Sequence, residues 1–321
     1  MSEDPLDLSL IIPVYNEEES LPKLHDWLHR VLKESKLTAE IIFIDDGSSD
    51  RSWPIIREFC KQQTQVKALR LQGNQGKSFA LQAGFDQAQG DVVITLDADM
   101  QDSPDEIPEL YRLIKEEAYD LVSGWKKKRY DPLEKRLPSR FFNGVTRWVS
   151  GIKLHDFNCG LKAYRKEVVK SITLYGEMHR YIPLLAKWNG FGRIGEKVVE
   201  HRAREFGKTK FGLERYLTGF LDLISVVFVT RFKKRPMHFF GGLGSISIFI
   251  GLSITTFVIG DKIYRISRHL PVRDVVDQPL FFLALVALVV GVQLFLAGFI
   301  AELILRVVPR KKDQVAEKLN G

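Results

Sequence analysis

Two long apolar stretches without a formal charge, residues 237–259 and 279–301, lie near the end of this 321-residue sequence. At a helical rise of about 1.5 Å per residue, each stretch is roughly 35 Å long and could cross a hydrocarbon core of about 30 Å. A buried helical hairpin in a soluble protein is the alternative, but two uncharged stretches of this length favour two transmembrane helices. The rest of the chain must then fold beside a membrane.

Basic residues flank the two stretches on their outer sides. The positive-inside rule therefore predicts that both flanks are cytoplasmic. The loop 260–278 also contains four basic residues, offset by three aspartates, so charge alone is a modest guide. Residues 1–7 carry three acidic residues and no apolar segment typical of a secretory signal, which favours a cytosolic first domain. The flanking basic residues are Arg231, Lys233, Lys234 and Arg235 before the first stretch and Arg306, Arg310, Lys311 and Lys312 after the second.

The sequence carries 47 lysines and arginines against 40 aspartates and glutamates, a formal net charge of +7. The excess gathers in segments such as 126–140, with seven basic and two acidic residues. Beside apolar stretches, this charge fits anionic lipid head groups or substrate phosphates better than nucleic acid. Cys60 and Cys159 lie far apart, without the spacing of a zinc site or a disulfide framework, which is typical of a reducing cytosolic setting.

Residues 8 to about 124 repeat one unit: a short apolar run, a polar turn and an amphipathic stretch of helical period. This repeat predicts an α/β fold, and the near-continuous apolar runs are typical of strands covered by helices on both faces. Residues 132–150 and 212–236 instead predict basic amphipathic helices, which either lie in a membrane interface or pack on the first domain. The predicted strands are 8–14, 40–45, 66–71, 91–96 and 120–123.

Polar residues follow the predicted strands at the ends where open α/β sheets bind ligands. Asp97-Ala98-Asp99 ends the fourth strand, and two such carboxylates can hold Mg²⁺ or Mn²⁺, which share oxygen ligands with substrate phosphates. Alone, this tripeptide is more often a solvated turn. The segments 13–17, 45–50 and 74–77 follow the first three strands and converge on the same crevice, which favours a site over isolated turns.

A helix start follows the aspartate motif. Ser103 suits the N-cap position, Pro104 the first helical position and Glu106 the third, so these residues predict a capping box. In a capping box, the N-cap hydroxyl and the Glu carboxylate each accept a backbone N–H. We therefore expect the turn 97–102 to be held between a strand and a helix.

Motifs of one known family occur in the right order along the chain. They are 13–17, 45–50, 74–77, 97–106 (DADMQDSPDE), 156–164 (DFNCGLKAY) and 204–210 (REFGKTK). They resemble glycosyltransferase family 2, with its GT-A nucleotide-sugar fold, and within it the polyprenyl-phosphate glycosyltransferases related to dolichol-phosphate mannose synthase and bacterial bactoprenol glucosyltransferase. Met100, Thr209 and Lys126 stand where the family often has leucine, serine and arginine.

The resemblance implies a role for each matching residue. Asp156 and Asp99 would be catalytic, with Asp156 orienting the acceptor or assisting its deprotonation; capping of its own turn is the alternative role of Asp156. A cation, Mg²⁺ or Mn²⁺, would be held by Asp97, Asp99 and Gln101. The nucleotide sugar would be bound by Pro13, Tyr15, Glu17, Asp46, Lys77, Asp97, Ala98 and Gln101. The acceptor and its phosphate would be bound by Lys126, Arg204 and Lys210, of which the last two could also belong to a solvated strand end.

The resemblance also implies an architecture. A Rossmann-like α/β domain of GT-A type would span 1–211 and lie in the cytosol. The juxtamembrane helix 212–236, a two-helix transmembrane hairpin in 237–305 and a cytosolic basic tail, 306–321, would follow. A bacterial inner membrane is the expected location, and a homotetramer is the expected form of any oligomer.

The activity implied is inverting transfer of a hexose from a nucleotide diphosphate sugar to undecaprenyl or another polyprenyl phosphate. UDP-glucose is preferred as donor over GDP-mannose, UDP-N-acetylglucosamine and an aminoarabinose donor. Alternatives are a relative with a protein or polysaccharide acceptor and, from another class, a non-catalytic membrane scaffold or flippase subunit. Two spans are few for a flippase, and the intact aspartate motif argues against a scaffold.

Overall fold

A computed structural model describes residues 6–127, 143–202 except 145 and 149, 236–307 and 315–319. The chain divides into two compact units: Met1–Val226 together with Lys312–Gly321, and Val227–Lys311. The predicted interface helix 212–236 lies outside the described residues apart from Pro236, as does most of 132–150.

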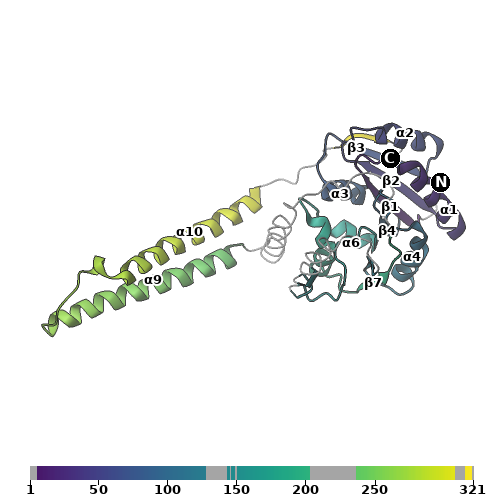
Figure 1. Ribbon diagram of the computed structural model, residues 1–321. Helices are drawn as coiled ribbons and strands as arrows, with labels where there is room; N and C mark the ends of the chain where they lie inside the picture. Colours follow the sequence, from purple (N-terminus) through teal and green to yellow (C-terminus); the bar gives the residue numbers. More distant parts are fainter. Residues whose placement is uncertain are drawn as a thin grey trace. The chain divides into compact units, whose positions relative to one another are not determined.

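The first unit contains a mixed sheet of eight described strands in the order β7-β5-β6-β4-β1-β2-β3-β8. Figure 1 labels the neighbouring strands β3, β2, β1 and β4 in this order. β1, β2, β3 and β4 are parallel, whereas β6 runs antiparallel to both β4 and β5. The five predicted strands are confirmed, and β6, β7 and β8 are additions. The strands are β1 Leu8–Val14, β2 Ala39–Asp45, β3 Val66–Leu71, β4 Val92–Thr95, β5 Leu121–Trp125, β6 Lys162–Arg165, β7 Ile194–Val198 and β8 Val315–Leu319.

Helices cover both faces of this sheet because alternate residues of its strands point to opposite sides. Leu8, Leu10 and Ile12 of β1 belong to one buried core that includes α1, α2 and α4. On the other face, α3 packs so closely that Gly84 lies directly against Ile11 and Ile44. The helices of this unit are α1 Leu21–Ser35, α2 Ser52–Gln62, α3 Lys77–Gln87, η1 Pro104–Glu106, α4 Ile107–Lys115, α6 Lys166–Ser171, η2 Met178–Tyr181 and α7 Ile182–Trp188.

The predicted capping box is wrong, although a helix does start at Pro104. The first turn is the 3₁₀ helix η1, and Ser103 makes no side-chain capping bond to it. The carboxylate of Glu106 instead pairs with Lys197 of β7 and accepts the backbone N–H of Glu200. The Glu106 carboxylate, which the local pattern assigned to the helix N-terminus, is therefore used in a long-range ion pair instead.

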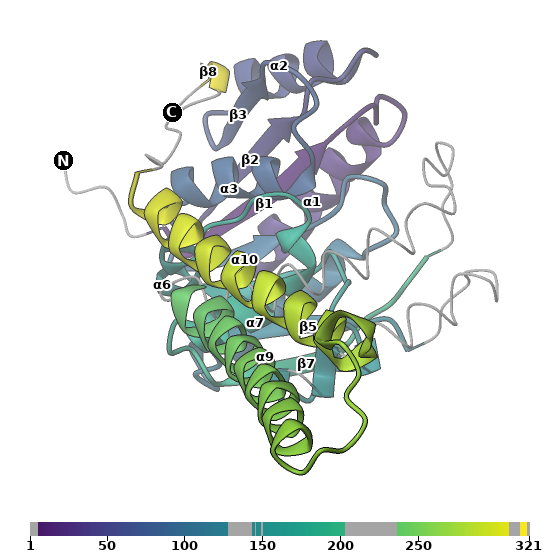
Figure 2. The same cartoon turned by 90° about the vertical axis from the view of Figure 1, so that its left-hand side faces the viewer.

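The second unit is a hairpin of two long helices, α9 Pro236–Ser267 and α10 Pro279–Val307, which run side by side (Figure 2). The 3₁₀ turn η3, Val275–Asp277, lies between them. Both helices are long and apolar enough to cross a membrane. They extend beyond the predicted 237–259 and 279–301; in α9 the Asp261–Arg265 ion pair, 2.7 Å across one helical turn, supports the polar extension.

Small residues bring the two hairpin helices close together. A Cβ at Gly244 would lie 2.7 Å from the carbonyl oxygen of Gly291, and one at Gly251 would lie 3.0 Å from that of Ala284. Ser247 Oγ donates to the carbonyl oxygen of Ala287 over 2.7 Å. Such contacts are typical of helix pairs in membranes, where close packing and interhelical hydrogen bonds replace the hydrophobic effect. Large apolar side chains such as Phe249 and Phe257 cover the exposed faces.

The strand β8 returns the chain to the first unit after the hairpin. It pairs antiparallel with β3, with Leu319 opposite Ala68 and Val315 opposite Leu71. The backbone pairing covers the edge of the parallel sheet next to β3. Both ends of the hairpin therefore connect to the same folded unit.

We expect the substitution Gly84→Val to lower the thermal stability of the protein. The Cβ of the new side chain would overlap Ile11 and lie 2.9 Å from Ile44 Cδ1. Such overpacking costs about 1–3 kcal/mol of folding free energy. The matched control is Gly192→Val, because a Cβ at Gly192 meets nothing within 4 Å. Scanning fluorimetry should show a fall of several degrees for Gly84→Val alone; equal melting temperatures would contradict the packing.

Candidate active site

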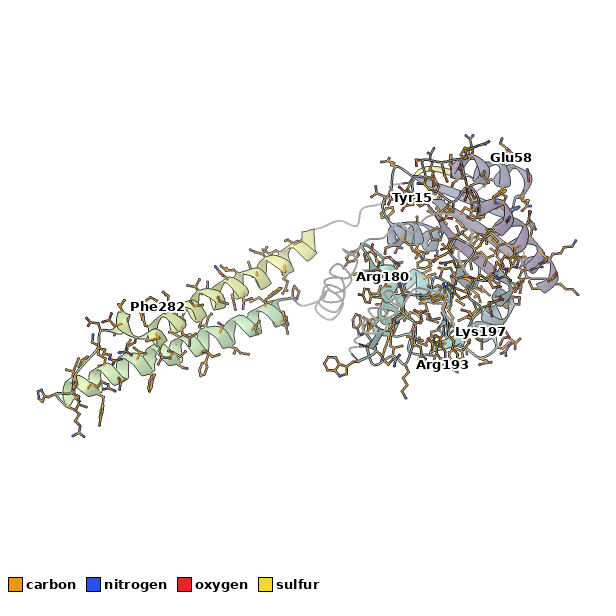
Figure 3. All side chains as sticks on the ribbon, in the orientation of Figure 1. Tyr15, Glu58, Arg180, Arg193, Lys197 and Phe282 are labelled. Carbon is orange, nitrogen blue, oxygen red and sulfur yellow. The ribbon has the colours of Figure 1, made fainter. Side chains whose placement is uncertain are left out.

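The polar turns predicted from the sequence meet at one edge of the sheet. β1 lies between β2 and β4, and the chain passes to β2 and β3 on one side before crossing to β4 on the other. Open α/β sheets bind ligands at such a switch point, beyond the carboxyl ends of the strands. Tyr15 follows β1, Asp46 follows β2 and Asp97 follows β4, so the structure places all three at this edge (Figure 3 labels Tyr15).

The turns after β1 and β2 are hydrogen-bonded to each other. Asn16 adopts a left-handed conformation with φ 54°, and its side-chain oxygen accepts the backbone N–H of Ser49 over 2.8 Å. The backbone N–H of Glu17 donates to Ser52 Oγ over 2.9 Å. Pro13, inside β1, lies opposite Ile44 of β2. The predicted nucleotide-binding residues of 13–17 thus sit on a braced turn.

Asp46 supports the loop that leads into α3. Its two carboxylate oxygens accept the backbone N–H groups of Gln75, over 2.7 Å, and Gly76, over 2.9 Å. Burial raises the pKa of Asp46, and these two hydrogen bonds oppose that rise without cancelling it. The predicted contact of Asp46 with the nucleotide stays a prediction; the structure adds a second role, the positioning of Lys77.

Gly47 allows the same loop to pass close to the turn after β2. Its φ is 71°, and a Cβ there would lie 2.6 Å from the backbone carbon of Gly73. A side chain would therefore meet both backbone strain and a steric clash. The glycine in the 45–50 motif is explained by this close approach.

Lys77 and Asp97 form an ion pair at the centre of the site. The distance between Lys77 Nζ and Asp97 Oδ1 is 2.5 Å, and the two side chains are 33% and 30% exposed. Burial alone would raise the pKa of Asp97, but the charge and hydrogen bond of Lys77 outweigh it and lower the pKa to about 2. Asp97 is therefore ionised at neutral pH and points at Lys77.

Asp99 lies on a tight turn after β4. Met100 adopts a left-handed φ of 59°, and the backbone N–H of Gln101 donates to Asp99 Oδ1 over 3.2 Å. The side chain of Ala98 is buried in the core, so only its backbone can face a ligand. Among the residues that the structure describes, no three His, Cys, Asp or Glu side chains are grouped as a metal site.

Asp99 nevertheless fits a hard cation. Mg²⁺ in enzymes that bind nucleotides is typically held by one or two carboxylates, with substrate phosphates and water completing its shell. Asp99 supplies one carboxylate at this edge of the sheet, and Asp97, paired with Lys77, supplies a second. The donor set therefore suits a cation that arrives with a diphosphate.

Lys126 is paired with a buried acid that the sequence analysis did not assign to the site. Its ammonium lies 2.7 Å from Asp102 Oδ1, and the side chains are 13% and 0% exposed. Asp102 also forms an isolated backbone bridge with His201. The predicted contact of Lys126 with the acceptor stays a prediction, but its charge is already partly neutralised. The signal for Asp102 was its place at the end of the DADMQD run.

Asp156 is buried, with 1% of its surface exposed. Its Oδ1 accepts the backbone N–H of Asn158 over 3.0 Å, which is the turn-capping role considered as the alternative. Its own N–H donates to Glu196 Oε1, and its carbonyl oxygen accepts Ser123 Oγ. The loop is thus held by strands β5 and β7, and the predicted catalytic role of Asp156 stays a prediction.

Gly160 has a structural role within the 156–164 motif. A Cβ at Gly160 would lie 2.8 Å from Asp97 Oδ1 and closer still to Oδ2. The carbonyl oxygen of Gly160 accepts the hydroxyl of Thr95 in β4 over 2.7 Å. The glycine therefore makes room for the carboxylate that Lys77 binds, a role that sequence reasoning missed. Arg204 and Lys210, the other predicted phosphate-binding residues, lie outside the described residues.

The first unit has a mixed α/β sheet of GT-A type with an acidic motif at its switch point. This is the fold of nucleotide-sugar transferases. Residues 9–173 match the sequence profile described as "Glycosyl transferase family 2". The chain belongs to glycosyltransferase family 2.

Two curated relatives are similar over most of their length. Dodecaprenyl-phosphate galacturonate synthase of Rhizobium johnstonii is 36% identical over 310 residues, which cover 94% of this chain and 88% of the relative. Undecaprenyl-phosphate 4-deoxy-4-formamido-L-arabinose transferase of Yersinia pestis is 36% identical over 254 residues, 78% of this chain and 75% of the relative. Both relatives are polyprenyl-phosphate sugar transferases by name.

Solved structures support the same fold. Glucosyl-3-phosphoglycerate synthase of Mycobacterium tuberculosis, in complex with Mn²⁺ and UDP-glucose, matches with a TM-score of 0.54 at 20% identity, over 70% of this chain and 79% of that one. Mannosyl-3-phosphoglycerate synthase of Rubrobacter xylanophilus matches with a TM-score of 0.56 at 16% identity, over 68% and 73%. At these identities the likeness concerns the fold.

We expect Gly160→Ala to weaken binding of the nucleotide sugar. The added methyl group would displace the Asp97 carboxylate from Lys77, and we expect a roughly 10-fold or greater loss in affinity, which corresponds to about 1.4 kcal/mol of binding free energy or more. Calorimetric titration should detect the loss, with Gly192→Ala as the matched control because its Cβ meets nothing within 4 Å. Unchanged affinity in both variants would show that the site tolerates movement of Asp97.

Proposed function

We propose that this enzyme transfers a sugar from a nucleotide diphosphate sugar to a polyprenyl phosphate, giving a polyprenyl-monophosphate sugar. The observation that carries the proposal is the similarity to dodecaprenyl-phosphate galacturonate synthase, which extends over 94% of the chain and so includes the hairpin. The ion-paired aspartate motif at the switch point supports it, because a transferase of this class must bind a diphosphate there.

The sugar is the open part of the proposal. The sequence favoured UDP-glucose, whereas the named relatives act on galacturonate and on a formamido-arabinose. Galacturonate is tested first, because its transferase is similar over the larger share of the chain. UDP-glucose and GDP-mannose follow.

Asp99 is the residue that we expect to hold Mg²⁺ or Mn²⁺, together with oxygens of the donor diphosphate, and Asp97 and Gln101 flank it. When bound, such a cation neutralises the negative charge that develops on the departing nucleoside diphosphate. Lys77 adds a positive charge at the same edge of the sheet and keeps Asp97 ionised.

The acceptor needs little activation. A phosphate monoester has a second pKa of about 6 and is largely a dianion near neutral pH. Asp156 therefore serves to orient the acceptor rather than to act as a strong base, and Lys126, Arg204 and Lys210 would draw its phosphate toward the anomeric carbon. Direct attack by the phosphate oxygen inverts the configuration of the sugar.

The hairpin α9–α10 would anchor the enzyme where its lipid substrate resides. Two apolar helices of this length can cross a membrane and return, and the chain before Val227 and after Lys311 belongs to the first unit. This connectivity supports a catalytic unit on one face of a membrane. We assign it to the cytoplasmic face of a bacterial inner membrane because basic residues flank the hairpin and the named relatives are bacterial. The predicted tetramer stays a prediction.

A donor panel tests the proposed activity. Purified enzyme in lipid nanodiscs with undecaprenyl phosphate would receive UDP-galacturonate, UDP-4-deoxy-4-formamido-L-arabinose, UDP-glucose or GDP-mannose, with and without Mn²⁺. Mass spectrometry should detect one new polyprenyl-phosphate sugar, and Asp99→Ala should reduce its formation by about 100-fold or more. Absence of any product from the wild type would favour the scaffold alternative; wild-type turnover in Asp99→Ala would contradict the metal assignment.

We expect Asp156→Asn to lower kcat by about 100-fold or more while the fold is retained. Asparagine keeps an oxygen that can accept the N–H of Asn158, but it removes the carboxylate that would pair with the basic groups around the acceptor phosphate and take up its remaining proton. Initial rates at saturating donor and lipid measure the effect, and the melting temperature reports on the fold. A wild-type kcat would leave only the turn-capping role.

A further inference from the structure

His179, in the 3₁₀ helix η2, is bonded twice to one hydroxyl group. Its backbone N–H donates to Ser78 Oγ over 2.9 Å, and the same oxygen lies 3.0 Å from the imidazole Nδ1. Ser78 directly follows Lys77 at the start of α3. The two hydrogen bonds therefore attach η2 to the part of α3 that carries the partner of Asp97.

These contacts determine which imidazole nitrogen carries the proton. Ser78 is buried, so its hydroxyl hydrogen needs an acceptor inside the protein. Among the described residues, Nδ1 of His179 is the acceptor within reach, while the backbone N–H of His179 occupies a lone pair of the same oxygen. Donation from Ser78 leaves Nδ1 without a hydrogen, and the proton of the neutral ring is then on Nε2.

The ring is neutral at physiological pH. Burial, reinforced by the nearby cations Lys77 and Arg180, holds the pKa of His179 well below its usual value, and the opposing effect of Asp97 is smaller. The side chain is 13% exposed. His179 is thus an uncharged donor whose orientation Ser78 determines.

Nε2 finds no hydrogen-bond acceptor in the part of the chain that the structure describes. Glu177 Oε2 lies 4.0 Å from it, beyond hydrogen-bond distance, and already binds Arg180 over 2.8 Å. Among the described residues, Nε2 is not one of the buried polar atoms that lack a partner, so its N–H group is open to solvent. An oxygen atom of a bound substrate could replace water as its acceptor.

The order of the strands indicates which part of a nucleotide sugar would lie near His179. Along the sheet edge, β2, β1 and β4 present Asp46, Tyr15 and Asp97 in that order. A nucleotide over Tyr15 and Asp46 would place the far end of the donor beside Asp97, next to Lys77 and His179. In Figure 3, Tyr15 and Arg180, the neighbour of His179 in η2, lie toward the same side of this unit.

We propose that His179 is a specificity-determining residue of the donor site and that its Nε2–H donates a hydrogen bond to an oxygen atom of the transferred sugar. This inference rests on the proposed function, since it needs a nucleotide sugar at the switch point. An N–H group of fixed direction can bind a hydroxyl or carboxylate oxygen at one position of the sugar ring. It discriminates against a sugar that has no oxygen at that position. η2 thereby contributes to the choice of sugar, whereas the turns after β1 and β2 hold the nucleotide.

The test compares two variants of His179. Asparagine retains an amide near the position of Nδ1, and glutamine places an N–H near the position of Nε2. For His179→Asn we expect kcat/KM for the donor accepted by the wild type to fall by roughly 10- to 100-fold, with the Kd of its sugar-free nucleoside diphosphate unchanged within about twofold. His179→Gln should recover most of the loss.

Two results would overturn the inference: a wild-type kcat/KM in His179→Asn, or an equal weakening of the donor and of the sugar-free nucleotide, which marks a purely structural role. If His179→Asn does not fold, Ser78→Ala provides the same comparison, because it keeps the imidazole but removes its orientation. Failure of the proposed function is separate. It would appear as a wild type that makes no lipid-linked sugar, whereas titration with UDP-galacturonate against UDP still measures the contribution of His179 to sugar binding.

Discussion

The carboxylate of Asp97 is enclosed by two segments that are far apart in the sequence. Lys77, from the start of α3, binds it over 2.5 Å, and Gly160, before β6, leaves only enough space for it. Asp46 holds the loop before Lys77, and Thr95 holds the carbonyl oxygen of Gly160. The ion pair therefore connects the segments that follow β2, β3 and β4. Displacing any of these supports would change the charge distribution at the proposed diphosphate site.

The same edge of the sheet carries two kinds of support, which match the proposed division between nucleotide binding and sugar binding. The turns after β1 and β2 are stiffened by hydrogen bonds between Asn16, Ser48 and Ser49, which suits a rigid nucleotide platform. On the α3 side, His179 is oriented by Ser78 and presents a single N–H. A general platform for the nucleotide and a separate contact for the sugar would let related enzymes keep one fold and select different donors.

Local pattern predicted most of the sheet, and failed where a distant partner competed. The five apolar runs became strands, and most of their residues are buried because helices cover both faces of the sheet. Glu106 was expected to cap a helix but pairs with Lys197, more than ninety residues away. The charge of Glu106 thus has a partner in the folded chain that its local sequence does not indicate. The pairing of Lys126 with the buried Asp102 was likewise not predicted, while the predicted contact of Lys126 with the acceptor stays a prediction.

By itself, the sequence determined the α/β class, the family, the aspartate motif and the pair of apolar helices, because periodicity, turn residues and uncharged length are local properties. Only the tertiary structure decided that β6 inserts antiparallel between β4 and β5, that β8 returns to β3, that Gly160 lies against Asp97, and that His179 is hydrogen-bonded to Ser78. These features depend on contacts between residues tens to hundreds of positions apart. No local sequence pattern predicts such a contact, because it forms and stabilises the protein only after the intervening chain has folded.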